Sequence, residues 1–167
     1  MRRRLWLLLT AAACVVAFVV AEALSGTGSS TARAAPALPA RVLEPPAVTL
    51  ARLHGRPAIV HFWASWCGPC QKEAPELAHL SRELGGKAAL VGVDYTDSAG
   101  SARTFIDRHA WHFPILFDPN GRVGDAYGLS GLPTTFVLDA DGRIAERLTG
   151  PQTAAGLMRA VGRLRSG

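Results

Sequence analysis

Residues 62–70 have the sequence FWASWCGPC, which places two cysteines three positions apart directly after a short apolar run. That run, residues 57–63, is rich in residues that favour β-strands and predicts a buried central strand. The Gly-Pro pair between the cysteines predicts a tight turn, and residues from about 70 to 84 predict a helix that ends at two glycines. Cys67 and Cys70 are therefore expected where a strand turns into a helix, within reach of one another for a disulfide.

Cys67, at the predicted start of a helix, is expected to be a reactive thiolate. The free backbone N–H groups and the helix dipole stabilise negative charge there, and the pKa of such cysteines falls from about 8.5 to roughly 3.5–7.5. We therefore expect Cys67 to attack the disulfide of a client protein and Cys70, one turn further on, to resolve the mixed disulfide. Pro69 suits the first helical turn, and Trp66, Gly68 and Pro69 are expected to contact the client.

The cysteine pair has two alternative interpretations, a zinc site and a structural disulfide. A zinc site needs four ligands, whereas the chain has three cysteines and no second pair of them. A permanently closed structural disulfide would span a loop too small to stabilise the fold much by chain entropy. We therefore expect a redox-active pair, with no metal site and no cofactor.

The rest of the chain alternates predicted strands with predicted helices, and Asp141 followed by Gly142 predicts a hairpin turn. This order predicts an α/β fold whose sheet is part parallel and part antiparallel. The predicted strands are residues 88–94, 113–117, 134–139 and 143–149, and the predicted helices are residues 98–109, 122–127 and 151–164.

The net charge of +5 is concentrated near the N-terminus of the 167-residue chain. Residues 1–45 carry five arginines and two glutamates, whereas the remainder carries 13 Lys and Arg against 11 Asp and Glu. Because the remainder is nearly balanced and has no basic run, we do not expect a nucleic-acid surface. A chain of this length suits one domain with a short appendage.

The N-terminal residues predict a membrane segment. Three arginines at positions 2–4 precede an uncharged stretch, residues 5–21, at the short limit of the roughly 17–25 residues that span a bilayer. The arginines keep the N-terminus in the cytoplasm, so we expect a catalytic domain anchored to the cell membrane on its extracytoplasmic side. The alternatives are cleavage of the segment, which would leave a secreted or periplasmic protein, and lipidation of Cys14.

These observations divide the chain into three expected parts. Residues 1–23 are the membrane anchor or signal helix. Residues 24–47, rich in Ser, Gly, Ala and Pro without periodicity, are an extended and partly flexible linker. Residues 48–167 are the globular domain.

The sequence resembles the thioredoxin superfamily and, within it, the membrane-anchored, extracytoplasmic TlpA/ResA/CcmG branch of thiol–disulfide oxidoreductases. The resemblance runs from about residue 48 to residue 164. It implies a thioredoxin fold with a central insertion, which we place at roughly residues 94–114. The motifs that carry it are FWASWCGPC at 62–70, QKEAP at 71–75, GLPTTF at 131–136 and DADG at 139–142.

The resemblance also implies roles for particular residues and partners. Pro133 would be a cis-proline opposite the cysteines, and the backbone of its loop, including Leu132, would pair with the extended chain of a client. Cys67 and Cys70 would cycle between a dithiol and a disulfide. The electron donor would be a membrane thiol carrier, and the clients would include the cysteines of apocytochromes c.

Glu73 continues the helix face that Cys70 begins. The two residues and Leu77, Leu80 and Leu84 are spaced by three and four positions, which places them on one apolar face. A carboxyl buried there has a raised pKa and could accept the proton of Cys70 near neutral pH, a role that the resemblance also gives it. The alternative is a solvated glutamate in the first helical turn, favoured by the helix dipole.

His61 departs from the thioredoxin pattern, in which a buried aspartate stands at this position. That aspartate assists deprotonation of the second cysteine. The sequence leaves two roles open for His61, a related part in proton handling and simple space filling.

The leading functional hypothesis is a reductase that keeps client cysteines reduced in an oxidising compartment. A Gly-Pro pair between the cysteines also occurs in reducing thioredoxin, with a potential of about −270 mV. One alternative is an exported oxidase that forms disulfides. Another, from a different class, is a copper metallochaperone, because cysteine thiolates bind Cu(I). A redox-inert interaction module and a thiol peroxidase are disfavoured by the two intact cysteines and their sequence context.

Overall fold

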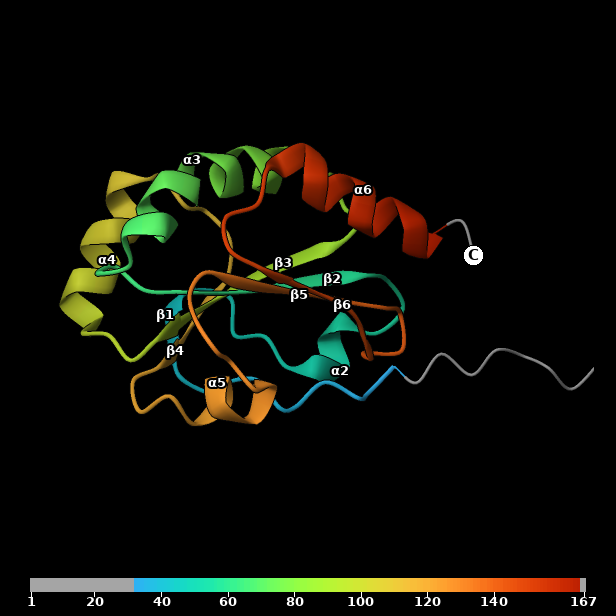
Figure 1. Cartoon of the computed structure of the whole chain (residues 1–167), viewed down its shortest axis with the longest axis horizontal. Helices are drawn as coiled ribbons and strands as arrows, with labels where there is room; N and C mark the ends of the chain where they lie inside the picture. The colour runs from blue at the N-terminus through green and yellow to red at the C-terminus, as the bar shows by residue number, and fades with distance from the viewer. Residues whose placement is uncertain (1–31, 166–167) are drawn as a thin grey trace, which may run out of the picture. The chain divides into compact units, whose positions relative to one another are not determined.

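Strand β2 (Ala58–Trp63) lies at the centre of a mixed sheet in the computed structural model, which describes residues 32–165. The other strands of these residues are β1 (Val42–Glu44), β3 (Ala89–Tyr95), β4 (Ile115–Asp118), β5 (Thr134–Leu138) and β6 (Ile144–Thr149). The six strands lie in the order β1-β4-β3-β2-β5-β6 (Figure 1). The pairs β2–β3 and β3–β4 are parallel, whereas β1–β4, β2–β5 and β5–β6 are antiparallel.

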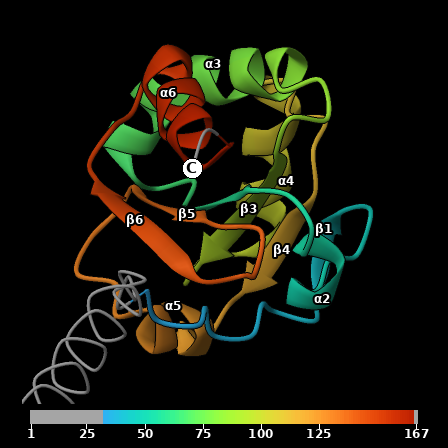
Figure 2. The ribbon, with the colours of Figure 1, turned by 90° about the vertical axis from the view of Figure 1, so that its right-hand side faces the viewer.

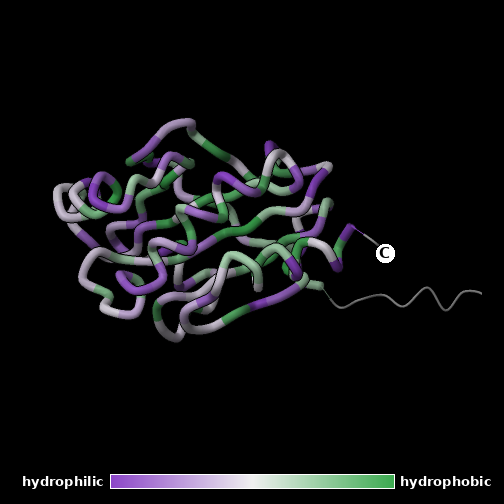
Figure 3. The backbone as a smooth tube through the Cα atoms, turned by 90° about the horizontal axis from the view of Figure 1, so that it is seen from above, coloured by the Kyte–Doolittle hydropathy of each residue, from purple (hydrophilic) through white to green (hydrophobic). Residues whose placement is uncertain are grey.

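Helices cover both faces of this sheet. One face carries α3 (Gly68–Glu83), α4 (Ala99–Arg108) and α6 (Ala154–Arg165), and the other carries α2 (Leu50–Leu53) and α5 (Arg122–Tyr127), as Figure 1 and Figure 2 show. The buried apolar side chains accordingly form two clusters. In Figure 3 the hydrophobic stretches run largely along the strands in the middle of the domain.

Both faces of β2 are buried, and each of its residues is at most 1% exposed. Ile59 and Trp63 belong to the apolar cluster beneath α3 and α4, whereas Val60 and Phe62 belong to the cluster on the opposite face. This burial explains why the strand has a continuous apolar sequence instead of an alternating one. The strict alternation of a strand also places His61 on the α3 face, with Ile59 and Trp63.

The predicted fold is confirmed, and the predicted elements occur in the predicted order. Helix α3 begins at Gly68, two residues earlier than expected, because Cys67 already occupies the position that caps the helix. The predicted central insertion, residues 94–114, contains α4. This helix connects β3 to the parallel strand β4, which begins directly after the range that we expected.

Residues 33–47, which we expected to belong to a linker, are part of the domain. The Ile144 N–H donates to the carbonyl of Arg33 over 2.8 Å, and the Ala35 N–H donates to the carbonyl of Gly142 over 3.0 Å. Further along, β1 pairs with β4. The compact unit therefore begins at Arg33 and not at residue 48. The sequence did not predict this boundary, because a three-residue strand and single backbone hydrogen bonds leave no periodic pattern.

The predicted membrane anchor or signal helix, residues 1–23, lies outside the described residues, as does Cys14. Among residues 32–165, no helix is long and apolar enough to cross a membrane.

The hydroxyl of Tyr127 gives a test of the corrected boundary. It donates to the carbonyl of Pro36 over 2.9 Å, and the side chain of Tyr127 is buried. Tyr127→Phe should lower the free energy of unfolding by about 0.5–1.5 kcal/mol, because a part-buried carbonyl loses its partner. The measurement is urea denaturation. Tyr95→Phe is the matched control, since its hydroxyl makes an exposed 3.4 Å contact with Asp125, and an equal effect of both variants would contradict the assignment.

Candidate functional site

Cys67 occupies the N-cap of α3, and it forms a disulfide with Cys70. The Cα atoms of the two cysteines are 5.2 Å apart, and the Cys70 N–H donates to the Cys67 sulfur over 3.2 Å. The structure therefore represents the oxidised form of the pair. When the disulfide opens, the same N–H and the start of α3 are placed to stabilise a thiolate at Cys67.

The loop that leads to the cysteines is fixed by the residues that follow β3. The Ser65 N–H donates to a carboxylate oxygen of Asp97 over 2.6 Å, and the Trp66 indole N–H donates to the carbonyl of Thr96 over 3.2 Å. Trp66 is nevertheless 59% exposed, and it is the one exposed large hydrophobic residue among residues 32–165. An apolar surface is thus held in solvent next to the cysteine pair.

A groove runs beside Cys67. Its other lining residues come from the active-site turn, the end of β3 and the loop before β5: Trp66, Gly68, Pro69, Tyr95, Leu129, Ser130, Gly131 and Leu132. The Leu132–Pro133 peptide bond is cis, as the resemblance implied. Four of the five predicted client contacts line this groove, and Pro133 is buried directly behind Leu132.

Glu73 is buried, with 2% of its surface exposed, on the face of α3 that carries Cys70. One carboxylate oxygen accepts the Gln152 N–H over 2.9 Å, and the other, Oε2, has no hydrogen-bond partner. Burial raises the pKa of Glu73 to about 7, the bond from Gln152 opposes this rise, and the charge of Glu76 adds to it. The alternative of a solvated glutamate is wrong, since the carboxyl lies in the core one turn from Cys70.

His61 faces Glu73 from the middle of β2. Its ring is 1% exposed, its Nδ1 lies 2.9 Å from the hydroxyl of Thr135, and its Nε2 lies 3.8 Å from Oε2 of Glu73. Burial lowers the pKa of His61 to about 3, so the ring is neutral at physiological pH. Sequence patterns do not predict this arrangement, because Thr135 is 74 positions away in the chain.

Asp94 is a buried acid that the sequence analysis did not single out. It is fully buried near the end of β3, and neither of its oxygens accepts a hydrogen bond from a donor. Burial above all, and then the negative charges of Asp97 and Asp118, raise the pKa of Asp94 to about 8. Asp94 is therefore protonated near neutral pH. Asp97, whose charge contributes to this rise, is the residue that holds the loop at Ser65.

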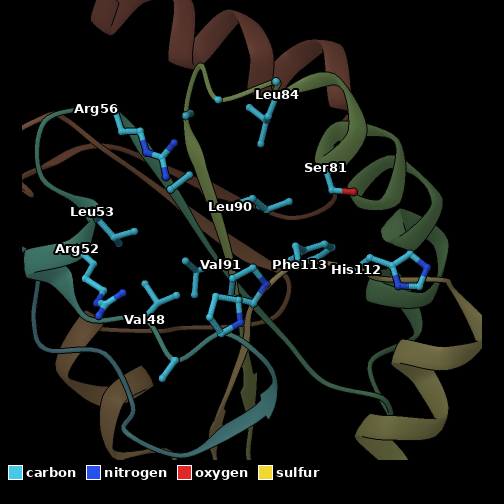
Figure 4. Close-up of a pocket in the computed structure, with 17 residues that line it drawn as sticks. Val48, Arg52, Leu53, Arg56, Ser81, Leu84, Leu90, Val91, His112 and Phe113 are labelled. Carbon is cyan, nitrogen blue, oxygen red and sulfur yellow. The ribbon is translucent and has the colours of Figure 1, made fainter.

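A second cleft lies at the other end of α3 (Figure 4). Arg52, Arg56, Leu84 and His112 are among its lining residues. The 16 residues of α3 correspond to roughly 24 Å of helix, so this cleft is remote from the cysteines. Within residues 32–165, no three His, Cys, Asp or Glu side chains are grouped so that they could hold a metal ion.

Comparison with known proteins gives the context for this site. The sequence model of the AhpC/TSA family matches residues 31–147. The thiol–disulfide oxidoreductase ResA of Bacillus thuringiensis (strain Al Hakam) is 34% identical over 114 residues, which cover 66% of this chain and 65% of that protein. The DsbE homolog of Paracoccus denitrificans (strain Pd 1222), a thiol:disulfide interchange protein, is 44% identical over 94 residues, 56% of this chain and 50% of that protein.

The chain thus spans no more than about two thirds of the length of these two relatives. A solved structure of a thioredoxin family protein from Chlorobium tepidum TLS superposes with a TM-score of 0.73 at 22% identity. The superposition covers 82% of this chain and 99% of that one, and it confirms the thioredoxin fold.

The raised pKa of Asp94 makes the stability of the domain depend on pH. The folded protein holds this proton up to about pH 8, whereas the ordinary value for an unfolded chain is 3.8. Folding therefore binds a proton between these values, and the free energy of unfolding falls as the pH rises through them. Asp94→Asn removes this dependence, so the variant should gain at least about 1 kcal/mol relative to the natural chain between pH 5 and pH 8.5.

Thermal unfolding at several pH values measures this gain. Asp107→Asn, an exposed change in α4, should leave the pH dependence as it is. Parallel stability curves for the natural chain and Asp94→Asn would contradict an acid that is protonated in the folded protein.

Proposed function

The chain belongs to the AhpC/TSA family, and on this premise we propose that it is a thiol–disulfide oxidoreductase of the ResA and DsbE type. The observation that carries the proposal is the Cys67–Cys70 disulfide at the N-terminus of α3, beside a groove that an exposed tryptophan borders. A thiol that can be ionised at a helix start, a second thiol one turn away and a client-sized groove are the parts that disulfide exchange needs.

In the reducing direction, the Cys67 thiolate attacks one sulfur of a client disulfide. This step forms a bond between Cys67 and the client and releases the other client sulfur as a thiolate. The Cys70 thiolate then attacks the Cys67 sulfur, which forms the Cys67–Cys70 disulfide and releases the second client sulfur. The client gains two electrons, the protein loses two, and the described structure corresponds to the product side of this reaction.

Glu73 is the acceptor for the proton of Cys70 in this proposal. Cys70 is 2% exposed, so its proton needs a nearby base before the sulfur can attack. The carboxyl lies one helical turn away with a pKa of about 7, which suits a general base near neutral pH.

The groove fits an extended client chain. Trp66 and Leu132 give it apolar lining, and Gly68 and Pro69 line it next to Cys67 in the sequence. We propose that the backbone of the loop at Leu132 and Pro133 pairs with the client, as the resemblance implies.

The direction, the client and the location belong to the same proposal. We expect a reductase whose clients include apocytochrome c cysteines and whose electrons come from a membrane thiol carrier. The arginine-led apolar segment at residues 2–21 supports an anchored domain on the extracytoplasmic side.

Redox titration against dithiothreitol and glutathione tests the direction. The Cys67–Cys70 couple should have a potential below about −200 mV, and the reduced protein should reduce insulin. Cys67→Ser should abolish insulin reduction, because the attacking sulfur is gone. A potential well above −200 mV would favour the exported oxidase, and insulin reduction that survives in Cys67→Ser would overturn the mechanism.

Cys70→Ala tests the client. The change leaves Cys67 able to attack and removes the sulfur that resolves the mixed disulfide. Clients should therefore accumulate in covalent complexes with Cys67 that dithiothreitol reduces. Cys67→Ser with Cys70→Ala is the matched control and should trap none.

The role of Glu73 predicts a pH dependence for the resolving step. Ionised Glu73 accepts the proton, so the rate should rise as the pH passes through about 7. Glu73→Gln should lose this inflection and slow the step by roughly tenfold or more at pH 7.5. Quenched-flow trapping of the mixed disulfide gives the rate. Glu83→Gln, an exposed change near the end of the same helix, should keep the natural profile, and an unchanged profile in Glu73→Gln would remove the proposed role.

A further inference from the structure

His61 is a buried titratable group that the proposed exchange reaction leaves unused. It stands between Thr135 and Glu73 in a short chain of polar side chains through the α3 side of the core. The hydroxyl of Thr135 is 2.9 Å from Nδ1, and Oε2 of Glu73 is 3.8 Å from Nε2. All three residues are buried, with exposed fractions of 0–2%.

The 3.8 Å gap between Nε2 of His61 and Oε2 of Glu73 is longer than a hydrogen bond. Oε2 of Glu73 has no other hydrogen-bond partner. A movement of about 1 Å would bring the two atoms to the ordinary N–H···O distance of about 2.9 Å. An unpaired carboxylate oxygen in the core destabilises the fold, so a hydrogen bond between Nε2 of His61 and Oε2 of Glu73 is energetically favoured.

A neutral imidazole carries one proton, and either ring nitrogen can hold it. When Glu73 is ionised, the arrangement that satisfies every group has the proton on Nε2, which donates to Oε2, while the Thr135 hydroxyl donates to Nδ1. When Glu73 is protonated, its O–H donates to Nε2, and the proton of the ring sits on Nδ1 and donates to the Thr135 oxygen. A hydroxyl can donate or accept, so Thr135 fits both arrangements.

We propose that His61 is a positioning residue whose tautomer follows the protonation of Glu73, so that its Nε2 pairs with Oε2 of Glu73 in both protonation states of the carboxyl. The proposal rests on the proposed role of Glu73 as the proton acceptor for Cys70. The ring holds one proton in both states and stays uncharged. The pair as a whole gains the single proton that Glu73 gains, so the proton count balances.

The surroundings of the pair are consistent with this assignment. From α3, Glu76 adds a negative charge that raises the pKa of Glu73, and the Cys67–Cys70 disulfide lies one turn back. From the segment before α6, the neutral amide of Gln152 donates to Oε1. From the loop after α4, Trp111 contacts the ring of His61 edge-on, with ring centroids 6.3 Å apart. Burial opposes a positive charge on the ring, so a change of tautomer is the response available to it.

The direct test is NMR of the full-length chain with ¹⁵N-labelled histidine and ¹³C-labelled glutamate carboxyl groups. The signal of His61 is assigned by its loss in His61→Gln, and that of Glu73 by its loss in Glu73→Gln. Between pH 5 and pH 9 the ring should stay neutral, and its proton should move from Nδ1 to Nε2 with the same midpoint as the titration of Glu73. A fixed tautomer across that titration, or a doubly protonated ring, would overturn the proposal.

Variants give a second arm. His61→Leu removes both the donor and the acceptor, and ionised Glu73 loses more than the neutral form does. The carboxyl pKa of Glu73 should therefore rise by at least about one unit, and the inflection of the resolving step should move with it. His61→Gln supplies both an N–H and a C=O, so the pKa of Glu73 in this variant should lie close to its value in the natural chain. His79→Gln, an exposed histidine on α3, should change neither value, and a Glu73 titration that is the same in His61→Leu would contradict the proposal.

Failure of this inference can be distinguished from failure of the proposed function. The NMR titration requires no activity, so a chain that fails to reduce insulin can still show or lack the change of tautomer. An active chain with a fixed His61 tautomer would sink this inference and leave the exchange mechanism in place. Because the NMR measurement uses the natural chain, it also decides the question where His61→Leu does not fold.

Discussion

The pairing of β2 on both of its edges is the constraint on which the site depends. The register with β5 sets Phe62 opposite Thr134, which brings the cis-proline loop to the end of β2. The register with β3 sets Trp63 opposite Asp94, which brings the loop that binds Ser65 and Trp66 to the same end. One strand thus fixes the cysteines and both walls of the groove, and a slip of one residue would turn every side chain of β2 to the wrong face.

Three ionisable residues are buried in the core around this strand, and their burial lowers the stability of the fold. His61, Glu73 and Asp94 each lie in the core, where burial favours the neutral form of the side chain. It lowers the pKa of His61 and raises the pKa of Glu73 and of Asp94. The burial of such groups normally weakens a fold, and groups with displaced pKa values tend to gather where chemistry occurs. Glu73 lies one helical turn from the second cysteine, and Asp94 lies near the end of β3, just before the Asp97 carboxylate that holds the loop before the first cysteine.

The sequence predicted the parts of the molecule that depend on periodicity and on local chemistry. The helical spacing of apolar residues was enough to predict that Glu73 is buried on the same helix face as Cys70. The apolar run at residues 57–63 was enough to predict the central strand. It did not predict contacts between distant segments that have no repeat. The pairing of His61 with Thr135 and the docking of residues 33–47 are such contacts. The burial of Asp94 was not predicted, because one acid at the end of an apolar strand usually marks the exit to solvent, whereas here Asp94 lies between the paired strands β2 and β4.

The exposed ring of Trp66 has an optical consequence. Trp63 and Trp111 are buried in the core with 0% and 1% of their surfaces exposed, whereas Trp66 is 59% exposed at the edge of the groove. Among the three tryptophans of residues 32–165, its emission is therefore the one that the arrival of a client would move toward shorter wavelength, while the two core indoles act as an internal reference. The disulfide next to it is an efficient quencher of indole emission, so the redox state and the occupancy of the groove would be reported by the same natural chromophore.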